Sequence, residues 1–448
     1  MRSLLCYLFM LAILASCKKY LDVKTDKKFV QPATLRDAQA ILDNYQLINQ
    51  VHPSLPAQSD DDFYLLDTYY NSVPESNQNA YRWAKDVTSN IDWRAVYGMV
   101  LAANTALETL EKIVPDSSEL NDWKKIKGSA YFIRGYSLLQ GVNVFAEPYQ
   151  KARSSLTFGI PLKLSSDINE IIFRPSLQQT YDQVISDLTR SVELLPVANS
   201  PVSRPSKPAA FAALARTYLA MQEYELAGKY ADSCLKLYST LIDYNLLNPS
   251  SPTPFSRFNA EVLFQSVMAT TTILSVNNMR IDSSLFQSYN INDLRRSLFF
   301  QSNGTNTFGF KGSYDGNTNS SHFNGLATDE IFLIRAECAA RLGFKDSAMA
   351  DLNHLLKTRW KTGFFVALTA SNADEALVKV LAERRKELII RGIRWYDLRR
   401  LNLDPRFEKT LLRRINNQLI QLTPNDPRYT FYIPSDVIAI SGIPQNIR

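Results

Sequence analysis

Apolar residues recur every three to four positions along most of the chain, and this spacing predicts a mostly α-helical protein. Between residues 34 and 50, one face of the predicted helix carries Leu35, Ala38, Ile41, Leu42 and Tyr45. The same spacing predicts helices over residues 92–113, 120–145, 176–195, 208–238 with one break, 329–342, 346–360 and 374–391.

Several of these helices carry signals at their ends. Ser176 is expected to cap one helix at its N-terminus, and Pro196 to stop it. Pro208 falls in the first turn of the next helix, where a missing N–H costs nothing. Gly392 follows the last predicted helix and supplies a turn there.

Two helix pairs share one spacing of small and apolar residues. Ala215, Ala227 and Leu235 are separated by twelve and then eight residues, and the same intervals separate Ala336, Ala348 and Leu356. Small residues at such positions let antiparallel helices approach closely, as in tetratricopeptide repeats. Generic helical hairpins also give this spacing by chance, so two copies leave both interpretations open.

Two long stretches interrupt the helical pattern. Residues 52–90 and 245–327 are rich in Pro, Asn, Ser, Gly and aromatic residues and show little periodicity. Loops of this length in a compact domain are usually functional or disordered. We therefore expect long irregular loops on a helical scaffold.

The first residues have the pattern of an export signal. Arg2 precedes an apolar run over residues 4–15, which is too short to span a bilayer as a helix. Leu14-Ala15-Ser16-Cys17 is similar to a bacterial lipobox, which predicts cleavage before Cys17 and acylation of its thiol. The alternative is a plain secretory signal with a chance cysteine. We expect a signal peptide over residues 1–16 and a lysine-rich, lipidated tether over residues 17–33.

Composition adds few constraints. The chain is 45% hydrophobic and 21% charged, as in ordinary globular proteins, and its formal charge of +6 is modest for 448 residues. An exported chain does not meet nucleic acid, so the basic balance indicates no such partner. Cys234 and Cys338 fall on apolar helix faces, where a free cysteine acts as a small hydrophobe. A disulfide between them is the less favoured alternative.

Charged motifs in the C-terminal quarter carry a family resemblance. Residues 383–388 read E-R-x-x-E-L, and residues 394–400 read R-x-x-D-L-x-R after the turn at Gly392. Together they resemble the signature of the SusD/RagB family. Further matching pieces occur in order along the chain: residues 17–22, Trp93, Tyr97, Asn104, residues 335–337, residues 348–359, Ile433-Pro434 and Gln445-Asn446.

The resemblance implies a SusD-like fold with tetratricopeptide-like helix pairs and irregular binding loops. It implies an outer-membrane lipoprotein, facing the cell surface, that binds oligosaccharides, or peptides in some members. Its partner would be a SusC-like, TonB-dependent β-barrel transporter, and no catalysis is expected. Residues 34–448 would form one domain, divided into an N-terminal part (34–244), a loop-rich insertion (245–327) and a signature part (328–448).

Charged clusters in the sequence favour structural roles. Glu383, Arg384, Glu387, Arg394 and Asp397 are expected to form an ion-pair network that fixes the signature turn, rather than a catalytic cluster. Residues 60–62 are three consecutive aspartates, for which a solvated acidic turn is favoured over a calcium site because no calcium-loop spacing follows. The three histidines lack metal-ligand spacing.

No cofactor is expected either, because the sequence has no Walker loop, dinucleotide-binding glycine fingerprint or nucleophile elbow.

Aromatic residues outside the predicted helices are the candidate ligand contacts. A sugar ring packs one face of C–H groups on Trp or Tyr, while polar side chains bind its hydroxyls. The predicted ligand-binding residues lie in the two loops and comprise Asp61, Tyr64, Tyr69, Tyr70, Tyr81, Trp83, Tyr289, Phe310 and Tyr314. The alternative for each ring is that it pins its loop to the scaffold.

Two other functions remain open at this point. A non-catalytic repeat scaffold could bind another envelope protein in its helical groove. A glycan hydrolase would need two carboxylates at a set separation, and no motif supports one. The chain departs from the resemblance in its modest length and in the lysines after Cys17, where surface-exported relatives often carry acidic residues.

Overall fold

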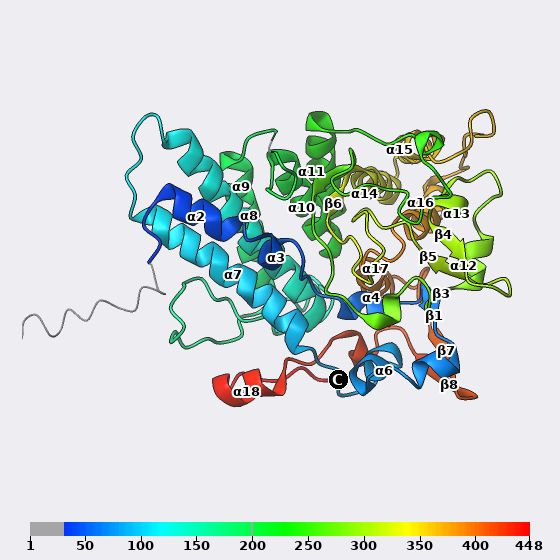
Figure 1. Cartoon of the computed structure of the whole chain (residues 1–448), viewed down its shortest axis with the longest axis horizontal. Coiled ribbons are helices and arrows are strands. Elements are labelled where there is room, and N and C mark those ends of the chain that lie inside the picture. Colours follow the sequence, from blue (N-terminus) through cyan, green and yellow to red (C-terminus); the bar gives the residue numbers. More distant parts are fainter. Residues whose placement is uncertain (1–30, 199) are drawn as a thin grey trace, which may run out of the picture.

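A computed structural model describes residues 31–198 and 200–448 of the chain, and it is mainly helical (Figure 1). This confirms the predicted fold class. The long helices that build the scaffold are α7 (Asn90–Glu111), α8 (Leu120–Phe145), α9 (Leu177–Leu194), α10 (Lys207–Ala220), α11 (Tyr224–Leu237), α14 (Thr328–Arg341), α15 (Lys345–Lys357), α16 (Ala373–Glu387) and α17 (Arg394–Leu401).

Several helix ends follow the signals in the sequence, but the helix predicted over residues 374–391 ends earlier, at Glu387. Ser176 caps α9 by accepting a hydrogen bond from the backbone N–H of Gln179, whose side chain returns the contact. The helix predicted over residues 34–50 is instead two helices, α2 (Leu35–Leu42) and α3 (Tyr45–Ile48). Asn44 breaks it, because its side chain accepts from the backbone N–H of Leu47 and starts a new helix.

The two helix pairs with matching spacing are helical hairpins that pack against each other. Helix α10 packs on α11, α14 on α15, and α11 on α14. Each hairpin turns through a residue of positive φ, Gln222 at 61° and Gly343 at 88°. The repeated residues Ala215, Ala227, Ala336 and Ala348 are fully buried, which permits the close helix approach that their size predicts.

The two long loops form one body rather than separate irregular segments. The first holds α4 (Leu55–Ser59), α5 (Asp67–Tyr70) and α6 (Glu75–Tyr81). Strand β1 (Phe63–Tyr64) of this loop pairs with β3 (Arg280–Ile281) of the second. A shared hydrophobic cluster joins Phe63 and Tyr81 to Phe286 and Phe300. The second loop also contains η1 (Tyr244–Leu246), β2 (Val262–Phe264), η2 (Thr272–Leu274), α12 (Ser283–Gln287), α13 (Arg295–Leu298), β4 (Phe300–Ser302), β5 (Phe308–Phe310) and β6 (Leu326–Ala327).

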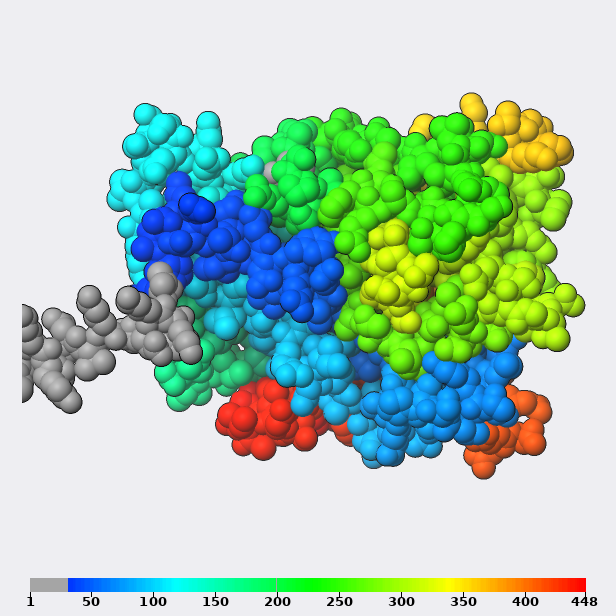
Figure 2. Space-filling model, viewed as in Figure 1, coloured from blue at the N-terminus to red at the C-terminus, as the bar shows by residue number. Residues whose placement is uncertain are grey.

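A hairpin near the C-terminus completes the surface next to the first loop. Strands β7 (Leu411–Ile415) and β8 (Gln418–Leu422) pair through a turn at Asn416 and Asn417, which both have positive φ. Figure 2 shows the first loop, in blue, against this hairpin, in orange, at the lower right. Helix α18 (Ser435–Ser441) follows near the chain end.

The signal peptide, the lipidation site at Cys17 and most of the tether lie outside the described residues. Within residues 31–198 and 200–448, no helix is both long and apolar enough to cross a membrane. Cys234 and Cys338 are buried and free in the structure.

Candidate ligand-binding site

A hollow of about 370 Å³ opens between the first loop, the start of α12 and strand β7. We call it the Arg413 hollow. It brings together four predicted site residues, and its lining comprises Asp61, Phe63, Tyr64, Tyr81, Trp83, Asp282, Ser284, Lys409, Thr410, Leu411, Leu412, Arg413 and Arg414. Its size suits a small ring and its neighbouring groups.

Arg413 covers the aromatic rings of the hollow. Its guanidinium carbon lies 3.6 Å from the ring centre of Tyr81 and 4.8 Å from that of Trp83. Its Nη2 donates to the carbonyl oxygen of Asp60 at 2.6 Å. A cation over a ring face is attracted by the ring's electrons. The guanidinium therefore occupies ring surface that a sugar would otherwise contact.

Trp83 is a packed core residue in this structure. Only 1% of it is exposed, and its Nε1 donates to the carbonyl oxygen of Ser59 at 2.8 Å. Its backbone φ of 56° is unusual for a bulky residue. Trp83 lines the hollow, but its ring is buried, and its contact with a ligand stays a prediction.

Asp61 holds three cations at one edge of the hollow. Arg394 Nε donates to one of its oxygens at 2.6 Å, and Lys409 Nζ to the other at 2.6 Å. Arg385 lies 3.3 Å away. Although burial opposes it, the guanidinium groups of Arg394 and Arg385 hold the pKa of Asp61 well below its usual range. Its partners therefore favour the carboxylate form of Asp61, and that charge is already paired.

The other two aspartates of residues 60–62 are fully buried, so the prediction of a solvated acidic turn is wrong. Burial and the neighbouring Asp62 raise the pKa of Asp60 well above its usual range. Asp62 accepts from Arg385 Nε at 3.1 Å. Arginines thus provide the counter-charges in this cluster.

The remaining predicted aromatics mostly pin the loops together. Tyr70, Tyr289, Phe310 and Tyr314 are buried in the cluster that joins the two loops. Tyr289 donates to the carbonyl oxygen of Lys386 at 2.8 Å, and Tyr314 donates to Glu261 at 2.9 Å. For these four residues the structure shows packing, as the alternative interpretation held. Of the predicted tyrosines, Tyr64 and Tyr69 alone are partly exposed.

Sequence reasoning missed the basic side of the hollow. Its basic residues are Lys409, which lies just before β7, and Arg413 and Arg414, which lie within it. No strand was predicted in this region. Residues 411–415 alternate between buried and exposed positions, and two asparagines follow. The buried positions include Arg413 and the exposed ones include Leu412, so the sequence shows no apolar–polar alternation there. Asn416 and Asn417 alone signal a turn, and only the fold places the hairpin against residues 60–83.

The five signature residues all form ion pairs, as predicted, but only Arg384 and Asp397 pair with each other, and the other three have partners outside the signature. Arg384 Nε donates to Asp397 at 2.8 Å. Arg295, which the sequence did not single out, contacts Asp293, Glu383 and Glu387 at 2.6–2.9 Å. Arg394 pairs instead with Asp61, at the edge of the Arg413 hollow.

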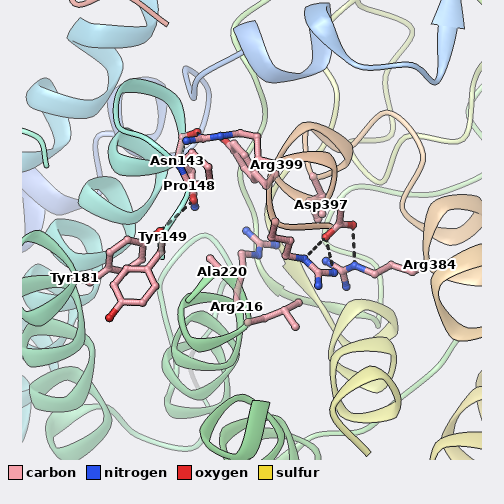
Figure 3. A pocket seen from close by; sticks show the side chains of 13 residues that line it. Asn143, Pro148, Tyr149, Tyr181, Arg216, Ala220, Arg384, Asp397 and Arg399 are labelled. Carbon is pink, nitrogen blue, oxygen red and sulfur yellow. Dashed lines mark hydrogen bonds and ion pairs between the residues drawn. The ribbon is translucent and has the colours of Figure 1, made fainter. Parts of the chain in front are cut away.

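A small cavity inside the signature region is too narrow for a sugar. Figure 3 shows Arg384 and Asp397 pointing toward each other beside it, with Arg399 above. Its volume is about 30 Å³, which is room for water rather than for a ligand. Arg399 instead donates to the carbonyl oxygens of Asn143 and Ala146, at the C-terminal end of α8.

A buried group of three carboxylates lies deeper in the same region. Oxygens of Glu261, Asp329 and Glu387 approach within 4.8 Å of one another. Arg359 donates to Glu261 and Glu387, and Arg391 donates to both oxygens of Asp329. These guanidinium groups therefore supply the positive charge that a metal ion would provide.

Comparison with known proteins identifies the family. Residues 19–219 match the family model described as "Starch-binding associating with outer membrane", and residues 288–435 match that of the SusD family. The chain belongs to the SusD/RagB family. It is 22% identical to SusD-like protein P2 of Formosa agariphila over 374 residues, which cover 69% of this chain and 71% of that protein.

Solved structures share the fold. A SusD superfamily protein from Bacteroides thetaiotaomicron is 21% identical with a TM-score of 0.73, covering 93% of this chain and 100% of that one. A SusD-like carbohydrate binding protein from Bacteroides vulgatus is 18% identical with a TM-score of 0.70, covering 92% and 97%. The SusD-like architecture expected from the signature is therefore confirmed.

Proposed function

We propose that this protein is a non-catalytic outer-membrane lipoprotein that binds oligosaccharides in the Arg413 hollow and delivers them to a SusC-like, TonB-dependent transporter. The observation that carries the proposal is the make-up of the hollow. It combines a partly exposed ring, Tyr64, with hydroxyl groups and charged side chains on a SusD-family scaffold. Sites for sugars need both an apolar face and convergent polar groups.

The charge state of the hollow supports binding without catalysis. A glycosidase needs a carboxylic acid of raised pKa to protonate the leaving oxygen, and a second carboxylate at a set distance. The carboxylates that line the hollow are Asp61 and Asp282. Asp61 is held ionised by its guanidinium partners, and Asp282 accepts from Ser284 Oγ and the backbone N–H of Leu285 at the start of α12. Both carboxylates are committed to structural contacts.

Affinity electrophoresis against a panel of polysaccharides tests the binding, followed by calorimetry with oligosaccharides and with peptides. We expect retardation in at least one glycan gel, without release of reducing ends from the bound polymer. Failure of the folded protein to bind any glycan would contradict the proposal. Binding of peptides alone would move the function to peptide capture, and release of reducing ends would indicate a hydrolase.

An exposed apolar loop is evidence for a large protein partner. Residues 156–173, between α8 and α9, expose Leu156, Ile168, Ile171 and Phe173 at 74–91%. Arg174 ties the base of this loop to the chain end by donating to the carbonyl oxygen of Pro444 at 2.8 Å. Exposed apolar clusters of this kind commonly mark protein contacts. We assign this loop to the transporter.

Co-purification from outer membranes tests the partner. We expect a β-barrel transporter as the main protein recovered, and less of it with Ile171→Asp. Val114→Asp is the matched control, because Val114 is 94% exposed in a different turn. Recovery of a soluble periplasmic protein instead would favour the repeat-scaffold alternative.

A further inference from the structure

The Arg413 hollow holds more positive than negative charge that is free to act on a ligand. Its charged lining consists of two aspartates, Asp61 and Asp282, and three basic residues, Lys409, Arg413 and Arg414. Lys409 is paired with Asp61 at 2.6 Å, but it shares that one carboxylate with Arg394 and Arg385. The contacts of Arg413 and Arg414 determine the rest of the charge balance in the hollow.

Arg413 has no carboxylate partner among the residues that the structure describes. Its guanidinium donates to the backbone carbonyl oxygens of Asp60 and Phe63 and lies over the rings of Tyr81 and Trp83. The residue is only 6% exposed, and its buried Nε has no hydrogen-bond partner. The nearby Asp60 meets Arg413 through its backbone carbonyl oxygen rather than through its carboxylate. Within the described ranges, Arg413 thus forms no ion pair and has one unbonded N–H group.

Arg414 is a second unpaired cation. It is exposed on the outward side of β7 and lines the hollow. No ion pair or side-chain hydrogen bond joins it to any other residue within 31–198 and 200–448. A planar guanidinium recognises carboxylate and sulfate oxygens through paired N–H donors, and such charge-assisted bonds are about twice as strong as neutral ones.

We infer that the ligand of the Arg413 hollow is an acidic oligosaccharide, whose carboxylate or sulfate groups contact Arg414 and Arg413. This rests on the proposed function and specifies its substrate class. A neutral sugar could use the same donors through its hydroxyls, but it would leave the net positive charge of the lining uncompensated. An anionic group compensates that charge and offers acceptor oxygens to the exposed guanidinium of Arg414.

Matched pairs of polymers test the charge preference. Affinity gels would contain polygalacturonate or its methyl ester, and carrageenan or its desulfated form. We expect retardation by the acidic member of at least one pair and little by its neutral counterpart. The pair that responds distinguishes carboxylate from sulfate. Retardation should weaken at about 0.5 M salt, where screening acts within roughly 4 Å.

Arg414→Gln provides the residue-level test. Because the side chain is exposed, the variant should fold normally and bind the acidic polymer about three- to tenfold more weakly. Arg414→Glu should weaken binding further. Arg36→Gln is the matched control, since Arg36 is exposed on α2 at the opposite end of the molecule (Figure 1).

Three outcomes separate this inference from the proposed function. Equal binding of charged and neutral polymers, or unchanged binding by Arg414→Gln, would overturn the inference and leave oligosaccharide binding intact. Binding of polyglutamate as tightly as of the acidic glycans would overturn the glycan class. Absence of binding to every glycan would overturn the proposed function itself.

Discussion

Arginines are prominent both in the signature turn and in the Arg413 hollow, but their contacts differ between the two regions. Around the turn, Arg400 donates to both oxygens of Glu337 at 2.5 and 2.8 Å, and Arg384 donates to Asp397. In the hollow, Arg413 rests on rings and backbone carbonyls, and Arg414 is unpaired. The first arrangement compensates its charges internally, whereas the second leaves charge for a ligand.

Asp61 marks the boundary between the two regions. It accepts from Arg394 of the signature helix on one side and from Lys409 of the hollow on the other. A buried charge that loses its partner costs several kcal/mol, so the signature network should tolerate little change. An exposed unpaired arginine has no partner to lose, and substituting it should affect the ligand rather than the fold.

The largest expected effect comes from breaking the buried network. Glu387 accepts from Arg295 Nη1 at 2.9 Å and from Arg359 Nε at 2.8 Å. Glu387→Gln keeps the shape but leaves two buried guanidinium groups short of negative charge. We expect the free energy of unfolding to fall by about 3–5 kcal/mol, measured by urea unfolding followed through tryptophan fluorescence.

The exposed Glu225 provides the control for that measurement. Glu225→Gln should leave the urea midpoint unchanged. If Glu387→Gln also left it unchanged, the signature charges would not be structural, and the contrast between the two regions would be lost.

Trp83→Ala should lower stability by a comparable amount, about 3–5 kcal/mol. The ring is 1% exposed, and its removal leaves a void under Arg413 and frees the carbonyl oxygen of Ser59. Thermal unfolding measures the loss, and Trp83→Phe should recover part of it. A Trp83→Ala protein with unchanged stability and abolished glycan binding would show instead that the indole is a ligand contact.

Acid should weaken the signature network within a defined pH window. Although burial opposes it, the guanidinium of Arg400 lowers the pKa of Glu337 to about 2, from an ordinary value of 4.5. The unfolded chain therefore takes up a proton first, and stability is lost as pH falls from about 4.5 toward 2. The loss is roughly 1.4 kcal/mol per pH unit.

Urea midpoints measured between pH 5 and pH 3 test this, with Glu337→Gln for comparison. The variant should be less stable at pH 5 and should show a shallower decline with acid. Parallel declines in the two proteins would mean that Glu337 does not carry the predicted shift.

The sequence predicted the parts of the fold that local patterns determine. The helix expected over residues 120–145 has those bounds, because its ends coincide with clear changes of pattern. The short elements in the two long loops could not be predicted, since β1 and β3 exist only through pairing across more than 200 residues of chain. Their stability comes from tertiary contacts, which a window of local sequence does not contain.

The candidate site was predicted less well, for a physical reason. Loop aromatics such as Tyr289 and Tyr314 can serve either as ligand platforms or as loop anchors, and composition is the same in both cases. Burial decides between them, and burial depends on the whole fold. Asp61 and Tyr64 do line the hollow, but Arg413 and Arg414 reach it from a hairpin about 350 residues away in sequence.

The smallest expected effect, and the one that locates the site most directly, concerns two tyrosines of the same loop. Tyr64 lines the Arg413 hollow, whereas Tyr69 lies outside its lining and donates to the carbonyl oxygen of Thr272 at 2.9 Å. Tyr64→Ala should weaken binding of the acidic oligosaccharide by roughly 0.5–1.5 kcal/mol, about two- to tenfold, as measured by calorimetry. Tyr69→Ala should leave the affinity unchanged, because that ring serves the loop contact. The reverse result would place the ligand across residues 66–72, on the surface beside the hollow, and the free charge of Arg413 and Arg414 would then need another explanation.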